Sequence, residues 1–176
     1  MSENEKKKLL EIKDLKIYYP IKGKRDAEGK PAYVKAVDGV SFEVYENETF
    51  GLVGESGCGK STTGRTVVRL NKPTAGSVTF EGHDLFAKMN RQQNMDLTQK
   101  IQIIYQDPYS SLDPRFTVGR CIEEPLIVHH MGNKEERRAR VLQLMHDVGL
   151  REEVYTRYPH EFSGGQRQRI GVARAL

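Results

Sequence analysis

The chain has 176 residues and a formal net charge of +4, with 37% hydrophobic and 30% charged residues. This length suits one folded domain, and the composition excludes a disordered or collagen-like chain. No apolar run approaches the roughly 20 residues that span a bilayer, and Cys58 and Cys121 lack metal-ligand spacing. We therefore expect a water-soluble domain in a reduced, cytosolic compartment. A sequence pI of about 9.0 supports a nucleic-acid partner only weakly, because acidic residues are interspersed with the basic ones.

Apolar and charged residues alternate in the first part of the chain, as is typical of strands with one exposed face. The segments with this pattern are Leu9–Tyr19, Val34–Val44 and Ser77–Phe80. Between the first two, Pro20 is expected to end the strand, and Ile21–Ala32 predicts a mobile hairpin loop or insertion. The short apolar run Thr49–Val53 predicts a strand buried on both faces of a parallel sheet.

Helical periodicity dominates the later part of the chain. The segments predicted as helices are Thr62–Leu70, Arg91–Lys100, Val118–His130 and Lys134–Val148. Ile101–Tyr105 predicts another buried strand, and Gln106–Arg115, with two prolines, predicts a loop. We therefore expect a mixed α/β core over residues 1–106 and a helical part over residues 107–176.

The sequence GESGCGKST, residues 54–62, matches the P-loop pattern between a predicted strand and a predicted helix. Glycines let successive backbone N–H groups and the helix start converge on phosphate oxygens. Lys60 is expected to reach the β and γ phosphates, Ser61 to bind Mg²⁺, and Thr62 to approach the α phosphate. The predicted nucleotide-binding residues are Gly54, Glu55, Ser56, Gly57, Cys58, Gly59, Lys60, Ser61 and Thr62.

A second phosphate site is predicted at the start of the last helix. Ser163 followed by Gln166 forms a capping box, which satisfies the N–H groups at a helix start. Gly164 and Gly165 cost the helix about 1 kcal/mol each relative to alanine, so capping alone does not account for them. Close approach of an anion does, because the N–H groups and helix dipole face it.

Three segments in order, GESGCGKST, YQDPYSSLDP and YPHEFSGGQRQRIGVARAL, resemble the ABC-type ATPases, specifically the ATP-binding subunits of dipeptide/oligopeptide importers. The resemblance runs from Leu9 to Leu176. It implies an α/β fold: a P-loop NTPase (RecA-like) core with an antiparallel β subdomain and a helical subdomain. It also implies ATP and Mg²⁺ as cofactors, ATP hydrolysis coupled to peptide uptake, and a cytoplasmic, peripheral location on the inner face of the cell membrane.

The resemblance assigns the turn over residues 162–166 to the γ phosphate held by a second ATPase subunit, identical or different, in a head-to-tail dimer. Gln106 matches a glutamine that holds Mg²⁺ or the attacking water, so Lys60 and Gln106 are the predicted catalytic residues, and Ser61 and Gln106 the predicted metal-binding ones. Residues 107–115 resemble the segment that contacts the transmembrane permease. Tyr19 matches the aromatic residue that stacks on adenine.

Several alternatives stay open. Tyr18 and Tyr33 lie near Tyr19, and Asp107 would bind Mg²⁺ in another class of P-loop protein. The arginines of the last helix suggest RNA binding, but solvated or paired charges are favoured; they are Arg167, Arg169 and Arg174.

The family continues past this point to a Walker B strand and a switch histidine. We therefore interpret the chain as an N-terminal fragment truncated before Walker B, which binds nucleotide and hydrolyses it slowly. The rival functions are a nucleotide-binding module without turnover and a soluble ABC-type ATPase acting on nucleic acid or the ribosome.

Overall fold

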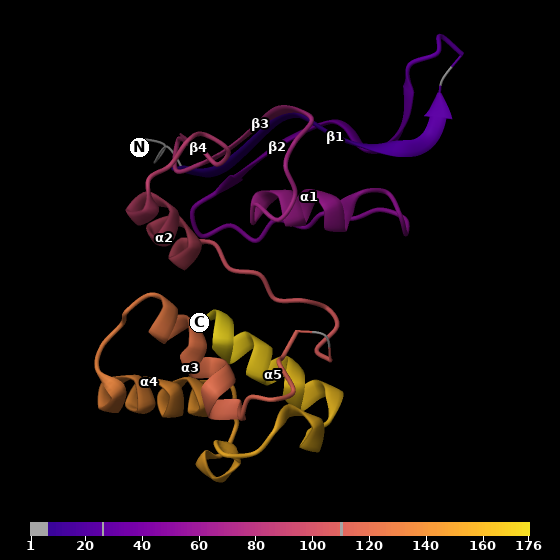
Figure 1. The fold of residues 1–176 in the computed structure, drawn as a ribbon. Helices are drawn as coiled ribbons and strands as arrows, with labels where there is room; N and C mark the ends of the chain where they lie inside the picture. The colour runs from indigo at the N-terminus through magenta and orange to yellow at the C-terminus, as the bar shows by residue number, and fades with distance from the viewer. Residues whose placement is uncertain (1–6, 26, 110) are drawn as a thin grey trace. The chain divides into compact units, whose positions relative to one another are not determined.

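The computed structural model describes residues 7–25, 27–109 and 111–176. The chain divides into two compact units, Met1–Asn90 and Arg91–Leu176 (Figure 1). These units are defined by contacts within each part of the chain. The expected division into a mixed α/β core over residues 1–106 and a helical part over residues 107–176 stays a prediction.

An antiparallel sheet with the strand order β2-β1-β3-β4 forms the first unit. Its strands are β1 (Lys8–Arg25), β2 (Pro31–Tyr45), β3 (Ala75–Phe80) and β4 (His83–Asp84). The expected antiparallel β part is therefore confirmed. Figure 1 shows β1 and β2 continuing together as a long hairpin beyond the rest of the sheet.

A bulge in β1 decides which of its residues are buried. Asp14 has a φ of 45°, and the pairing with β2 shifts between Ile12 and Leu15. Strict alternation would bury Asp14 with Ile12, but the extra residue moves Leu15 and Ile17 onto the buried face. All three aliphatic side chains are at most 1% exposed. The Asp14 amide donates to the Ser41 hydroxyl at 2.8 Å, so the bulged backbone keeps a hydrogen-bond partner.

The prediction that Pro20 ends the first strand was wrong. β1 continues to Arg25, and Pro20 pairs with Tyr33 of β2. β3 pairs with β1 only from Leu10 to Lys16, so beyond that point one edge of β1 is open. A strand tolerates proline at an open edge because no neighbour needs its missing N–H.

The two buried parallel strands predicted at Thr49–Val53 and Ile101–Tyr105 are also not observed. Both segments are irregular, and Val53 is 89% exposed while Ile104 is 48% exposed. A strand needs a neighbouring strand to receive its N–H and C=O groups. In the described part of the chain no strand pairs with either segment, so apolar composition alone did not make them strands.

Helix α1 (Lys60–Val67) starts two residues earlier and ends sooner than expected, and it buries Thr63 and Thr66. Both buried hydroxyls donate to backbone carbonyls one turn earlier, Gly59 at 3.1 Å and Thr62 at 2.8 Å. These bonds satisfy the polar groups of the buried face. The buried face of α1 is therefore polar, and both of its hydroxyl groups are hydrogen-bonded.

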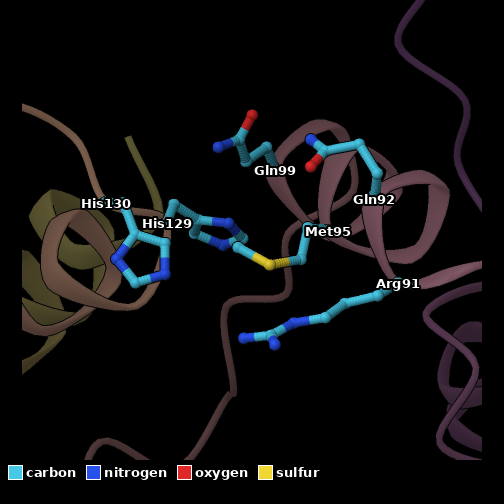
Figure 2. A pocket seen from close by; sticks show the side chains of 6 residues that line it. All are labelled: Arg91, Gln92, Met95, Gln99, His129 and His130. Carbon is cyan, nitrogen blue, oxygen red and sulfur yellow. The ribbon is translucent and has the colours of Figure 1, made fainter.

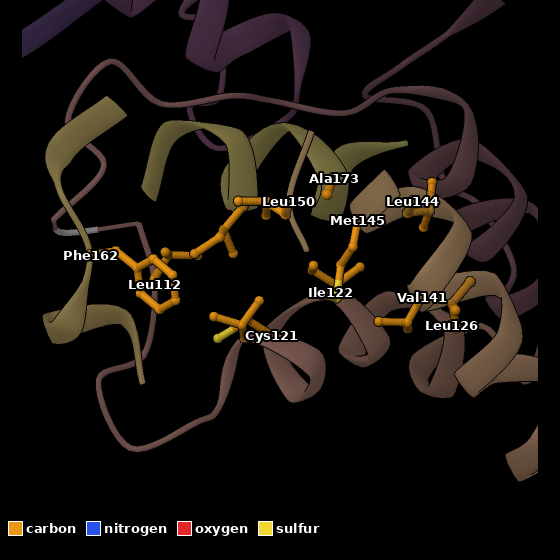
Figure 3. Close-up of a cluster of buried hydrophobic side chains, with 12 residues drawn as sticks. Leu112, Cys121, Ile122, Leu126, Val141, Leu144, Met145, Leu150, Phe162 and Ala173 are labelled. Atoms are coloured by element: carbon orange, nitrogen blue, oxygen red, sulfur yellow. The ribbon is translucent and has the colours of Figure 1, made fainter. Parts of the chain in front are cut away.

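Helices build the second unit, as expected. They are α2 (Arg91–Lys100), α3 (Val118–Val128), α4 (Lys134–Asp147) and α5 (Gly164–Ala175), with the short 3-10 helices η1 (Glu152–Val154) and η2 (Pro159–Glu161). α3, α4 and α5 enclose one apolar core (Figure 3), in which Ile122, Val141 and Ile170 are at most 1% exposed. Over the described residues, none of the helices combines the length and apolarity required to traverse a membrane.

Candidate functional site

The glycines of the loop at residues 54–59 allow a close fold that other residues would obstruct. Gly57 and Gly59 have φ angles of 83° and 95°, in the left-handed region. A Cβ atom on Gly59 would lie 2.4 Å from the Ala36 carbonyl oxygen in β2, and one on Gly54 would lie 2.7 Å from Cys58 Sγ. The backbone of the loop thus encloses a space that the side chain of any residue other than glycine would occupy.

The ammonium group of Lys60 closes this loop on itself. Its Nζ atom donates to the carbonyl oxygens of Gly54 and Glu55, both at 2.6 Å, and lies 3.4 Å from Cys58 Sγ. A cation therefore lies inside the curve of the backbone, where it would attract an anion. Loss of the two bonds to carbonyl oxygens would free the same ammonium group for another acceptor.

The start of α1 is open to an anionic ligand. Gly59 is its N-cap residue, with no side-chain hydrogen bond to the first turn and no acidic residue in that turn. Helix N-terminal N–H groups without a side-chain cap bind phosphate readily. The exposed Ser61 stands in this turn with an oxygen of the kind that Mg²⁺ prefers. The residues present therefore fit a nucleotide phosphate group with its Mg²⁺.

The tyrosines near the end of the predicted first strand differ in their contacts. The Tyr18 hydroxyl donates to Asp38, whose pKa is lowered by that bond and by Lys35. Tyr19 pairs with Val34 in the sheet, and its ring is 44% exposed. Tyr33 is 51% exposed. Tyr18 is therefore engaged within the sheet, whereas Tyr19 and Tyr33 present exposed rings.

The second predicted anion site forms the start of α5. Ser163 accepts a hydrogen bond from the Gln166 amide at 3.4 Å, and the Ser163 amide donates to Gln166 Oε1 at 3.1 Å, which confirms the capping box. A Cβ atom on Gly164 or Gly165 would meet nothing within 4 Å. Among the described residues, no neighbouring atom therefore requires glycine at either position.

Gln106 belongs to the second unit, whereas the P-loop belongs to the first. Its side chain is exposed, and the preceding carbonyl of Tyr105 accepts a bond from Gln168 Nε2 of α5 at 3.5 Å. Asp107 accepts from the Tyr109 amide at 2.9 Å, which closes a local turn. The described residues contain no cluster of three or more His, Cys, Asp or Glu that could hold a metal.

The predicted permease-facing segment, residues 107–115, is described except for Ser110, which lies outside the described residues. Toward its end, Arg115 donates to Asp113 Oδ1 at 3.0 Å and to Asp113 Oδ2 at 2.7 Å. This paired bond lowers the pKa of the Asp113 carboxyl group to about 2. The segment is thus a structured loop that presents paired charge.

The comparisons with known proteins decide the family. A family model described as ABC transporter matches residues 37–176. The chain belongs to the ABC transporter family.

Its curated relatives include peptide-transport proteins. This ABC transporter chain is 53% identical over 169 residues to the putative oligopeptide transport ATP-binding protein YkfD of Bacillus subtilis, covering 96% of this chain and 49% of the relative. It is 49% identical over 168 residues to the dipeptide transport ATP-binding protein DppF of Escherichia coli, with 96% and 49% covered. The chain thus spans about half the length of the curated relatives it matches.

Solved structures confirm the expected fold class. The ATP-binding cassette MJ0796, a dimer bound to ADP and Pi, is 29% identical with a TM-score of 0.81, covering 96% of this chain and 69% of that one. For cbiO1 from Clostridium perfringens the identity is 24% and the TM-score 0.72, with 97% and 61% covered. This ABC transporter chain therefore has the α/β fold of ABC ATPase cassettes, with an antiparallel β part and a helical part.

One expectation for the last helix of this ABC transporter chain was wrong. Arg167 is not a solvated charge: it is 8% exposed and donates to the Phe162 carbonyl oxygen through Nε at 2.9 Å and Nη2 at 2.6 Å. Arg174 donates to the Ser111 carbonyl oxygen at 2.6 Å. Helical periodicity could not predict these hydrogen bonds, because their acceptors are backbone oxygens of irregular segments.

A separate hollow of about 470 Å³ lies between α2 and the end of α3. Figure 2 shows the Met95 side chain reaching toward His129 there, with Arg91 beside them. The Nδ1 atom of His129 is buried without a hydrogen-bond partner among the described residues. The sequence shows no sign of this hollow, because the residues that line it form no motif.

Proposed function

We propose that this chain is the nucleotide-binding part of an ATPase subunit that drives peptide uptake through a membrane permease. Two observations support the proposal: the P-loop forms a glycine-lined cradle around the Lys60 ammonium group, and the relatives reported above are oligopeptide and dipeptide transport proteins. Those relatives do not favour the alternative of a soluble ATPase acting on nucleic acid. The core over residues 1–106 binds nucleotide, and the helical part over residues 107–176 carries the partner contacts.

Binding starts at the P-loop. The Lys60 ammonium group exchanges its bonds to Gly54 and Glu55 for the β and γ phosphates of ATP, while α1 N–H groups bind phosphate oxygens. Ser61 holds Mg²⁺, and the exposed ring of Tyr19 stacks on adenine. Mg²⁺, when bound, neutralises charge on the β and γ phosphates. These residues bind and orient the nucleotide, so we expect the 176-residue chain itself to bind ATP.

The turn Ser163–Gln166 contacts the γ phosphate held by a second subunit, in a head-to-tail dimer. The open space beside Gly164 and Gly165 supports this role, because it leaves room for a ligand from outside the chain. Gln106 senses the phosphate or its attacking water, and residues 107–115 contact the permease. The subunit is therefore peripheral, on the cytoplasmic face of the membrane.

The decisive test replaces Lys60 in the full-length protein. Lys60→Ala should abolish ATP-dependent peptide uptake, whereas Lys72→Ala, an exposed lysine in the same unit, should leave uptake unchanged. Unimpaired uptake by Lys60→Ala would reject the proposal.

A second measurement addresses the 176-residue chain. ATP titration should show saturable binding that Lys60→Ala removes, with little phosphate release. Rapid Mg²⁺-dependent release that requires Ser61 would contradict slow hydrolysis by this chain while leaving ATP binding in place.

A further inference from the structure

Arg167 fixes the backbone immediately before the anion-binding turn of α5. Two of its nitrogen atoms donate to the same oxygen, the Phe162 carbonyl, and Phe162 directly precedes the N-cap residue Ser163. Phe162 is itself 6% exposed. The position of the Ser163–Gln166 turn is therefore set by the guanidinium group as well as by the apolar core under Phe162.

The same guanidinium group stacks on an aromatic ring from another segment. Its Cζ atom lies 3.7 Å from the centre of the Tyr109 ring, and Tyr109 is 67% exposed. In the described residues no carboxylate forms an ion pair with Arg167. A buried charge requires compensation, and here the carbonyl oxygen and the aromatic ring supply it. An apolar side chain would fill the space and make neither contact.

Two more side chains of α5 bind the segment around Tyr109. Gln168 donates to the Tyr105 carbonyl oxygen at 3.5 Å, and Arg174, about two helical turns after Arg167, donates to the Ser111 carbonyl oxygen at 2.6 Å. One helix thus carries the anion-binding turn at its start and holds backbone on both sides of Tyr109. A displacement of Tyr109 has a direct mechanical route to the turn through Arg167.

We propose that Arg167 is a positioning residue that couples Tyr109 to the anion-binding turn Ser163–Gln166. This inference rests on the proposed function. In it, the permease contacts Tyr109, and that contact changes how tightly the Ser163–Gln166 turn binds the γ phosphate. The planar guanidinium group makes the forked bond and the ring stack at the same time, and a lysine ammonium group does not reproduce that geometry. Arg167→Lys therefore keeps the charge and removes the coupling.

The test is a double-mutant cycle in the full-length subunit assembled with its permease in lipid vesicles. The measured quantity is the ratio of ATP hydrolysis with peptide to hydrolysis without it. Arg167→Lys and Tyr109→Leu should each lower this ratio by about tenfold, within the usual range of coupling between sites. The double variant should be no worse than either single variant, and Tyr109→Phe should restore the ratio because it keeps the ring.

Arg138→Lys is the matched control. The Arg138 guanidinium also lies over a tyrosine, 5.0 Å from the centre of the Tyr155 ring, but it belongs to α4 and not to α5. This variant should leave the ratio unchanged. Effects of Arg167→Lys and Tyr109→Leu that multiply, or an equal loss in Arg138→Lys, would overturn the inference.

Amide hydrogen exchange on the 176-residue chain separates this inference from the proposed function. Tyr109→Leu should speed exchange by about tenfold at the hydrogen-bonded amides of Ser163, Gln166 and Arg167, through loss of the Arg167 contact, and Arg138→Lys should not. Unchanged exchange in Tyr109→Leu overturns the coupling. A wild-type protein with no peptide-stimulated hydrolysis would count against the transport function, and the exchange result would still decide the coupling.

Discussion

Gly59, the residue that precedes α1, lies against the backbone carbonyl of Ala36 in β2. A Cβ atom at this position would come within 2.4 Å of that oxygen and within 3.2 Å of Val37 Cγ2. The start of the P-loop helix is therefore set by direct contact with the sheet, and the contact tolerates only a hydrogen atom. This relationship explains why the last glycine of the loop is needed for packing as well as for phosphate access.

Gly59→Ala should destabilise the chain by about 2 kcal/mol or more, because it adds a clash with backbone to a left-handed φ. Gly64→Ala is the matched control in the same helix, since its Cβ would meet nothing and its φ is not left-handed. That variant should stabilise the chain by up to about 1 kcal/mol. Urea unfolding of both variants measures the difference in their stability. Equal unfolding midpoints would contradict the close contact between Gly59 and the Ala36 carbonyl oxygen.

Gly164→Ala and Gly165→Ala should separate stability from function. Open space surrounds both positions, so alanine should leave the free energy of unfolding unchanged or raise it by up to about 1 kcal/mol. The same methyl groups should weaken ATP-driven dimerisation of the full-length subunit, because they occupy the space in which we propose that the partner's phosphate approaches. Thermal unfolding and light scattering with ATP test both parts. A destabilised variant would show that the glycines serve packing instead.

The two thiols should react very differently. Cys58 is exposed in the P-loop, whereas Cys121 is 2% exposed and burial raises its pKa to about 11. At pH 8 a thiol reagent should modify Cys58 in the native chain and Cys121 only after unfolding. ATP should protect Cys58, whose Sγ lies 3.4 Å from Lys60 Nζ. Cys58→Ala provides the control, and rapid native labelling of that variant would contradict the buried position of Cys121.

The Asp113 pair should contribute to acid stability. Hydrogen bonds from Arg115 lower the pKa of Asp113 to about 2 in the folded chain, below its ordinary value. A carboxyl group with a lowered folded pKa stabilises the fold above its unfolded pKa and loses that contribution as pH falls through the folded value. Asp113→Asn should therefore unfold at lower urea than wild type at pH 7, and the difference between the two midpoints should shrink as pH falls from about 4 to about 2. A difference as large at pH 2 as at pH 7 would argue against this pair.

The sequence by itself determined those features whose conformation follows from residue type or from contacts between residues close together in the chain. The glycines and Lys60 predicted the P-loop because left-handed backbone and an open helix start follow from residue type. The Ser163–Gln166 capping box was equally predictable, and so were the helices at Arg91–Lys100 and Lys134–Asp147. The capping box and these two helices depend on residues within one or two turns of each other.

Tertiary structure alone decided the remainder. Thr49–Val53 and Ile101–Tyr105 have the composition of buried strands, yet a strand forms only when a neighbour pairs with it, and neither segment has one in the described part of the chain. The bulge at Asp14 and the burial of Arg167 likewise depend on partners distant in sequence, Ser41 and Tyr109. Hydrogen bonds and ring contacts between residues so far apart produce no periodic pattern in the sequence, so only the folded chain reveals them.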